Sequence, residues 1–168
     1  IDGIAAGIDR ARDDFGIEAR INMTFERHRP GAEAEKDADM ILSYPHPYIV
    51  GLDIAGGEQE GDMETFHPIF EKVTDNFPHP LGIRMHAGEG AGPDNVRTAL
   101  SFGSTRVGHG VRSVEDPKLL EELKAEGTVL EVCPTSNLYL MPQYQCDIQN
   151  HPLRRLYDAG VKVTINSD

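Results

Sequence analysis

The sequence predicts an α/β fold in which one parallel β-sheet is assembled from successive strand–helix units. Short apolar runs recur along the 168 residues and alternate with segments of helical periodicity. The starts of consecutive apolar runs are 23 to 33 residues apart, which leaves room for one helix between each pair of strands. Strict alternation at this spacing is typical of parallel sheets with right-handed helical connections.

Six apolar runs are expected to form the strands. Each run is short and apolar, as is typical of strands that are covered on both faces. The runs occupy residues 19–25, 48–54, 81–85, 105–108, 128–133 and 161–166.

The segments between the runs are expected to be helices, and several carry start or stop signals. Phe66, Phe70 and Val73 repeat at steps of three and four, so they share one helical face. Pro93 suits the first turn of a helix, and Gly127 suits the position just after one. The expected helices span residues 4–15, 32–44, 63–77, 93–102, 114–126 and 152–159, and residues 134–149 form the longest expected loop.

Both a (β/α)8 barrel and an open doubly wound sheet fit this alternation. The barrel is favoured because polar motifs follow nearly every expected strand, at the end where barrel enzymes carry their active sites. The glycine-rich run at 88–92 lacks the G-x-G-x-x-G spacing of a dinucleotide site. We therefore predict a single domain over residues 1–168, a parallel (β/α)8 TIM-type barrel of which this chain supplies about six βα units.

The composition argues against several classes of protein. Sixteen Lys and Arg against 28 Asp and Glu give a formal net charge of −12, which disfavours binding to nucleic acid or to an anionic membrane surface. No apolar run is long enough to cross a bilayer, and no segment resembles a signal peptide. Two cysteines are too few for a disulfide framework, so a reducing cytoplasmic location is expected.

Two neighbouring strands are followed by residues that can carry chemistry. His86 and Glu89 come directly after the strand at 81–85, and His109 stands between two glycines after the next strand. A neutral imidazole can bind a metal ion, and a nearby carboxylate can transfer a proton to a substrate atom. Taken alone, a His-x-x-Glu segment is more commonly a solvated loop, and a lone histidine is more commonly structural.

Other strand ends offer further candidates. Asp168 follows the last strand, where an acidic residue fits a catalytic or metal-binding role and a helix cap equally well. Gly56 could bring a backbone N–H close to a ligand, and a plain turn fits it as well. Cys133 is not expected to be a nucleophile, because no dedicated partner base is evident. The remaining histidines are expected to be structural or solvated: His28, His46, His67, His79 and His151.

Four of these candidates agree on one arrangement. In a barrel, His86, Glu89, His109 and Asp168 would lie at the carboxyl ends of three strands. Two of them are good zinc ligands and the other two are good acid–base groups. This combination indicates metal-assisted hydrolysis.

Five motifs share their order and spacing with a known family. They are GLDIAGGE at 51–58, HAGEG at 86–90, RVGHG at 106–110, EVCPTSN at 131–137 and TINSD at 164–168. Together they resemble the adenosine deaminase family of amidohydrolase-like metal-dependent hydrolases, and the resemblance covers essentially the whole chain. It implies zinc-dependent hydrolytic deamination of a 6-aminopurine on a (β/α)8 barrel, with adenosine or 2′-deoxyadenosine as the favoured substrate.

The resemblance also implies roles for individual residues. His86 and Asp168 would be ligands of one Zn²⁺ ion, and Glu89 would donate a proton to the purine ring nitrogen N1. His109 would orient or deprotonate the zinc-bound water, and the backbone of Gly56 would meet the purine ring. A small purine is then the expected partner, and the oligomeric state stays open.

The sequence departs from the family pattern in one important respect. The family supplies two further zinc ligands as His-x-His on its first strand, and no two of the seven histidines here lie two apart. Since the chain starts without Met and stops directly after a strand-like run, we expect it to be an excerpt that lacks the first strands and the C-terminal helices. The alternatives are adenine or another adenine-containing metabolite as substrate, and a non-catalytic purine-binding fragment or pseudoenzyme. A lyase is disfavoured, because no expected strand ends in Lys.

Overall fold

The computed structural model describes residues 1–168 and contains one six-stranded sheet. The strands are hydrogen-bonded to one another in sequence order, and every neighbouring pair is parallel. An open doubly wound sheet would reverse this order near its middle. The expected set of six parallel strands in sequential order is therefore confirmed, as β1 (Ile21–Glu26), β2 (Ile49–Ala55), β3 (Gly82–Ala87), β4 (Arg106–His109), β5 (Val129–Val132) and β6 (Lys162–Ile165).

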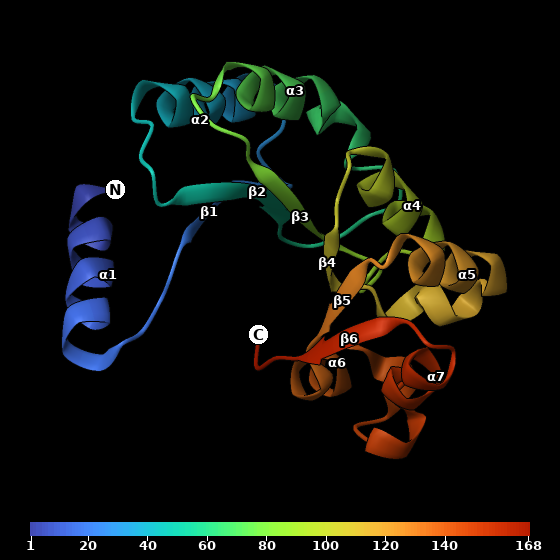
Figure 1. Ribbon diagram of the computed structural model, residues 1–168. Helices are drawn as coiled ribbons and strands as arrows, with labels where there is room; N and C mark the ends of the chain where they lie inside the picture. Colours follow the sequence, from blue (N-terminus) through green and yellow to red (C-terminus); the bar gives the residue numbers. More distant parts are fainter.

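The sheet is curved, and most of the helices follow its outer side (Figure 1). This one-sided cover is the arrangement of a barrel wall, in which strands form the inner layer and helices form the outer ring. The six expected helices are all present, as α1 (Asp2–Phe15), α2 (Ala32–Ser43), α3 (His67–Asn76), α4 (Pro93–Ser101), α5 (Pro117–Glu126) and α7 (Leu153–Asp158). None of the helices is both long and apolar enough to span a membrane.

The core lies between the outer face of the sheet and these helices. The aromatic stripe predicted on the third helical segment is buried, and Phe70 of α3 packs against Phe25 of β1 with their ring centroids 5.2 Å apart. Leu119 of α5 and Leu130 of β5 are also fully buried. Apolar packing therefore seals the outer face of the sheet.

Helix α1 forms where it was expected, but its apolar side chains are not buried in this chain. Phe15 is 75% exposed, and of the α1 residues only Ala5 is buried. The helix stands apart from the outer ring, beside β1 (Figure 1). A side-chain contact ties it to the sheet, because Arg12 donates a hydrogen bond to the hydroxyl of Tyr48 at 2.7 Å.

The prediction of a long loop over residues 134–149 is wrong. The segment contains helix α6 (Pro134–Leu140) and two short 3-10 turns, η3 (Pro142–Tyr144) and η4 (Ile148–Asn150). Pro134 starts the helix in the first turn, where its missing N–H costs nothing. The small polar residues after it suggested a loop, whereas they form a helix that follows the carboxyl end of β5.

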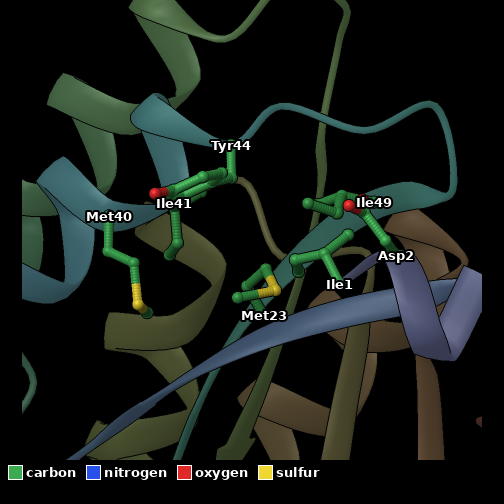
Figure 2. A pocket seen from close by; sticks show the side chains of 7 residues that line it. All are labelled: Ile1, Asp2, Met23, Met40, Ile41, Tyr44 and Ile49. Carbon is green, nitrogen blue, oxygen red and sulfur yellow. The ribbon is translucent and has the colours of Figure 1, made fainter.

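An apolar hollow of about 420 Å³ lies near the start of α1, and Figure 2 shows its lining. Six of its seven lining residues are hydrophobic, and its only acidic group is Asp2. None of the predicted site residues lies there, so it does not hold the chemistry expected from the sequence. The lining consists of Ile1, Asp2, Met23, Met40, Ile41, Tyr44 and Ile49.

Candidate active site

The five predicted site residues line one cavity of about 480 Å³ at the carboxyl ends of the strands. Gly56 follows β2, His86 belongs to β3, His109 ends β4, and Asp168 follows β6. Glu89 comes from the loop after β3. Leu140 and Met141, from the end of α6, also line the cavity. The structure therefore brings together every residue that the sequence selected.

The pairing of β3 with β4 places the two site histidines side by side. His86 is in register with Gly108, and Ala87 with His109. The ring centroids of His86 and His109 lie 5.3 Å apart. A Cβ atom on Gly108 would stand 2.9 Å from Cδ2 of His86, so only glycine leaves room for that ring.

His109 has a strained backbone. Its φ is 62°, in the left-handed region that bulky residues rarely adopt, and its side chain is buried. A conformation of this kind costs about 1–3 kcal/mol and persists only where the surroundings impose it. With this backbone, His109 lines the cavity.

Three side chains offer donor atoms for a metal ion. One donor atom each of His86, His109 and Asp168 lies within 4.8 Å of the others. Imidazole nitrogen and carboxylate oxygen are donors that zinc accepts. The chemistry of this donor set therefore fits a divalent metal ion.

The ring of His86 is oriented by Asp53 of β2. Nδ1 of His86 lies 3.1 Å from Oδ1 of Asp53, and that carboxylate is almost completely buried. Arg84 also lies 3.4 Å from Nδ1, but its guanidinium donates to the other oxygen of Asp53. We therefore place the ring proton of His86 on Nδ1, from which it is donated to the carboxylate of Asp53. This leaves the lone pair of Nε2 free for a metal ion.

The carboxyl group of Glu89 is half-buried, in contact with Asn137 and near the carboxylates of Asp168 and Glu58. Its Oε1 accepts a hydrogen bond from Nδ2 of Asn137 at 2.6 Å. Burial raises the pKa of Glu89, and the negative charges of Asp168 and Glu58 add to the increase, whereas the Asn137 hydrogen bond opposes it. A carboxyl group with a raised pKa can keep a proton for delivery to a substrate.

The imidazole of His109 is enclosed by site residues. Burial lowers the pKa of His109, although the nearby carboxylate of Asp168 opposes that decrease. Nε2 of His109 lies 3.9 Å from Asp168, and Nδ1 lies 3.1 Å from Nδ2 of Asn137. The neutral ring is therefore favoured, with one nitrogen directed at the metal-ligand candidates and the other at an amide.

Cys133 is unsuited to nucleophilic attack. Burial raises the pKa of its thiol to about 11, and the carboxylates of Asp168 and Glu89 add to the increase. Since the thiolate is the reactive form, a protonated thiol is inert at neutral pH. This agrees with its interpretation from the sequence.

Glu58 has a structural role that the sequence analysis missed. Its carboxylate accepts hydrogen bonds from four consecutive backbone N–H groups, those of residues 88–91, at 2.7 to 3.0 Å. It also accepts from the side chain of Asn95. The loop that carries Glu89 is therefore folded around the Glu58 carboxylate. The only signal in the sequence was an acidic residue beside two glycines.

A curved parallel sheet with histidine and carboxylate donors at its carboxyl ends is typical of metal-dependent barrel hydrolases. A sequence-family model described as adenosine deaminase matches residues 1–168. The chain belongs to the adenosine deaminase family, as the motifs predicted.

Individual relatives agree with this assignment. An adenine deaminase of Sinorhizobium medicae (strain WSM419) is 43% identical over 169 residues, which cover 100% of this chain and 51% of the relative. The crystal structure of an adenine deaminase from Arthrobacter aurescens has a TM-score of 0.90 at 27% identity, covering 100% of this chain and 50% of that one. An amidohydrolase from Burkholderia ambifaria with bound Zn has a TM-score of 0.85 at 29% identity, and the match covers 98% of this chain and 45% of that one. The chain spans about half the length of the curated relatives it matches, and its sheet is part of a TIM-type barrel.

Replacing Glu58 by Ala should loosen the loop that carries Glu89. The change leaves four backbone N–H groups without their charged acceptor, and we expect the free energy of unfolding to fall by about 2 kcal/mol. Amide hydrogen exchange should accelerate at residues 88–91. The matched control is Glu64→Ala, an exposed residue of η1 (Glu64–Phe66), which should change the free energy of unfolding by less than about 0.5 kcal/mol. Unchanged exchange at 88–91 in the Glu58 variant would show that the contact does not hold the loop.

Proposed function

We propose that this chain forms the catalytic face of a zinc-dependent aminohydrolase that converts adenine and water to hypoxanthine and ammonia. The observation that carries the proposal is the gathering of His86, Glu89, His109 and Asp168 in one cavity. Adenine replaces the adenosine favoured by the sequence, because the curated relatives at 41 to 44% identity are adenine deaminases. This was the alternative that the sequence left open.

His86 and Asp168 are the proposed ligands from this chain. Nε2 of His86 is free because Asp53 holds Nδ1, and Asp168 lies across the cavity beside His109. When bound, a zinc ion supplies Lewis-acid activation of water at neutral pH. Catalytic zinc usually has three protein ligands, so further ligands are expected from the His-x-His motif of the family, which this chain does not contain.

Glu89 is the proposed proton donor. Burial raises its pKa, which favours the protonated form of the carboxyl group. Transfer of a proton from Glu89 to N1 of the purine would make the neighbouring carbon C6 more electrophilic. A bond from the water oxygen to C6 forms and the bond from C6 to the amino nitrogen breaks. Of the two protons of the water, one leaves with the amino group as ammonia and the other returns to the carboxylate of Glu89, so that C6 ends as the carbonyl carbon of hypoxanthine. His109 orients the attacking water, and the backbone of Gly56 meets the purine ring.

The surroundings fit a small substrate. The cavity of about 480 Å³ lies at the lower end of the range for small-molecule sites. A purine is the expected partner, because the curated relatives are adenine deaminases. Both cysteines are free thiols, which supports the cytoplasm as the proposed location.

The substrate and the acid can be tested together in the full-length protein. We expect turnover of adenine to hypoxanthine with a higher kcat/KM than that of adenosine to inosine, measured from the ultraviolet change and from ammonia release. Glu89→Gln keeps the shape of the side chain but removes the titratable proton, so kcat for adenine should fall by about 10²-fold or more. Zinc content should stay near that of the unmodified protein. Near-normal turnover in the variant would exclude Glu89 as the acid, and a preference for adenosine would overturn the substrate proposal.

Metal analysis tests the assignment of His86. In the full-length protein, His86→Ala should lose most of its zinc, because the remaining donors hold the ion with a reduced ligand set. Its activity should fall with its zinc content. His67→Ala, on the outer helix α3, is the control and should keep its zinc. Full zinc stoichiometry with intact activity in the His86 variant would show that the metal site lies elsewhere.

A further inference from the structure

Asn137 lies at the junction of the two groups proposed to handle protons. The side chain is completely buried in α6. Its Nδ2 is 2.6 Å from Oε1 of Glu89 and 3.1 Å from Nδ1 of His109. Oε1 of Glu89 and Nδ1 of His109 are themselves only 3.3 Å apart. One amide group therefore bridges the carboxyl group and the imidazole.

The direction of the amide decides what each neighbour can do. An NH2 group donates two hydrogen bonds, whereas an amide oxygen only accepts. If the NH2 group faces the site, both neighbours must accept from it. If the oxygen faces the site, His109 must carry its proton on Nδ1 and Glu89 must carry its proton on Oε1.

A second buried histidine settles the direction of the amide. Nδ1 of His151 lies 3.1 Å from the backbone nitrogen of Leu153, and because that N–H can only donate, Nδ1 is the acceptor. Burial lowers the pKa of His151, so the ring is neutral and its single proton is on Nε2. Nε2 lies 3.3 Å from Oδ1 of Asn137. The N–H of His151 therefore holds the amide oxygen away from the site.

The opposite orientation is disfavoured at both ends of the amide. It would place the NH2 group of Asn137 against the Nε2–H of His151, two donors with no acceptor between them. It would also place Oδ1 2.6 Å from Oε1 of Glu89, so the proton of Glu89 would have to be held on Oε1 against the amide and would not be free for a substrate. The chain of contacts thus has one consistent set of donors and acceptors, which runs from the backbone of Leu153 to His109.

We propose that His151 and Asn137 are positioning residues that fix His109 as the tautomer with its proton on Nε2 and leave Oε2 of Glu89 as the oxygen that carries the transferable proton. This inference rests on the proposed function and deepens it. His109 then presents an N–H to the cavity. It orients the water by hydrogen bonding and does not take a proton from it.

The same assignment distinguishes the two site histidines. His86 keeps its proton on Nδ1, toward Asp53, and offers the lone pair of Nε2. His109 keeps its proton on Nε2, and a protonated nitrogen cannot be a metal ligand. The cluster of His86, His109 and Asp168 therefore contributes two ligands and one hydrogen-bond donor.

The direct test is the tautomer of His109, measured by two-dimensional ¹⁵N NMR of the full-length protein labelled at histidine. We expect His109 to show a protonated Nε2 and an unprotonated Nδ1, both without metal and with zinc bound. A protonated Nδ1, or an Nε2 signal typical of a metal-bound nitrogen, would overturn the proposal. The measurement does not depend on turnover, so it stands apart from any failure of the deaminase proposal.

Asn137→Asp tests the amide with almost the same shape. The aspartate accepts but does not donate, so we expect the proton of His109 to move to Nδ1 and kcat to fall by about 10²-fold, the usual size of an acid–base contribution. Unchanged tautomer and kcat in a folded variant would overturn the role of Asn137. If this variant does not fold, the tautomer of the unmodified protein still decides the question.

A pair of substitutions at His151 separates positioning from packing. His151→Leu removes the donor to Asn137, and we expect kcat to fall about tenfold, the scale of one hydrogen bond, with KM less affected. His151→Gln can still donate from its own Nε2 and should restore most of kcat and the tautomer of His109. Equal losses in the two variants, with the tautomer of His109 unchanged, would show that His151 only fills space.

Discussion

The site depends on one constraint, which is that the carboxyl ends of parallel strands meet at the same edge of a sheet. The sheet has its six strands in sequence order, so residues that are more than 80 positions apart, such as His86 and Asp168, line one cavity. The curvature of the sheet turns these ends toward a common centre. Apolar packing on the outer face fixes the strands. The positions of the strands in turn determine where the side chains that line the cavity lie.

Within that constraint, backbone geometry sets the details. The loop after β3 is folded around the carboxylate of Glu58, and Gly108 leaves the space that the His86 ring occupies. The left-handed backbone of His109 directs its ring into the same cavity. Charged side chains next to the site are also paired, because the guanidinium of Arg84 donates hydrogen bonds to the carboxylates of Asp53 and of Glu131 in β5. Contacts within the chain therefore fix the positions of the site residues.

The sequence predicted the strands and the main site residues, because both depend on local patterns. Apolar runs mark strands, and a histidine or acid just after one lies at a predictable edge. The contributions of Glu58 and Asn137 depend on contacts between segments 30 and 48 residues apart, and no local pattern records them. Residues 134–140 were expected to be a loop because small polar residues suit loops and first helical turns alike. The helix expected over residues 4–15 forms as α1, but Ile4 and Phe15 stay exposed, because burial requires a packing partner and not only a helical pattern.

The central claim is that His86 and Asp168 hold one metal ion while Glu89 and His109 stand beside it. Anomalous diffraction at the zinc edge, from crystals of the full-length protein, tests it most directly. We predict a single peak in the cavity at about 2.0–2.2 Å from Nε2 of His86 and from a carboxylate oxygen of Asp168, with neither Glu89 nor His109 bonded to the ion. A peak bonded to Glu89 or to His109, or a peak outside this cavity, would contradict it.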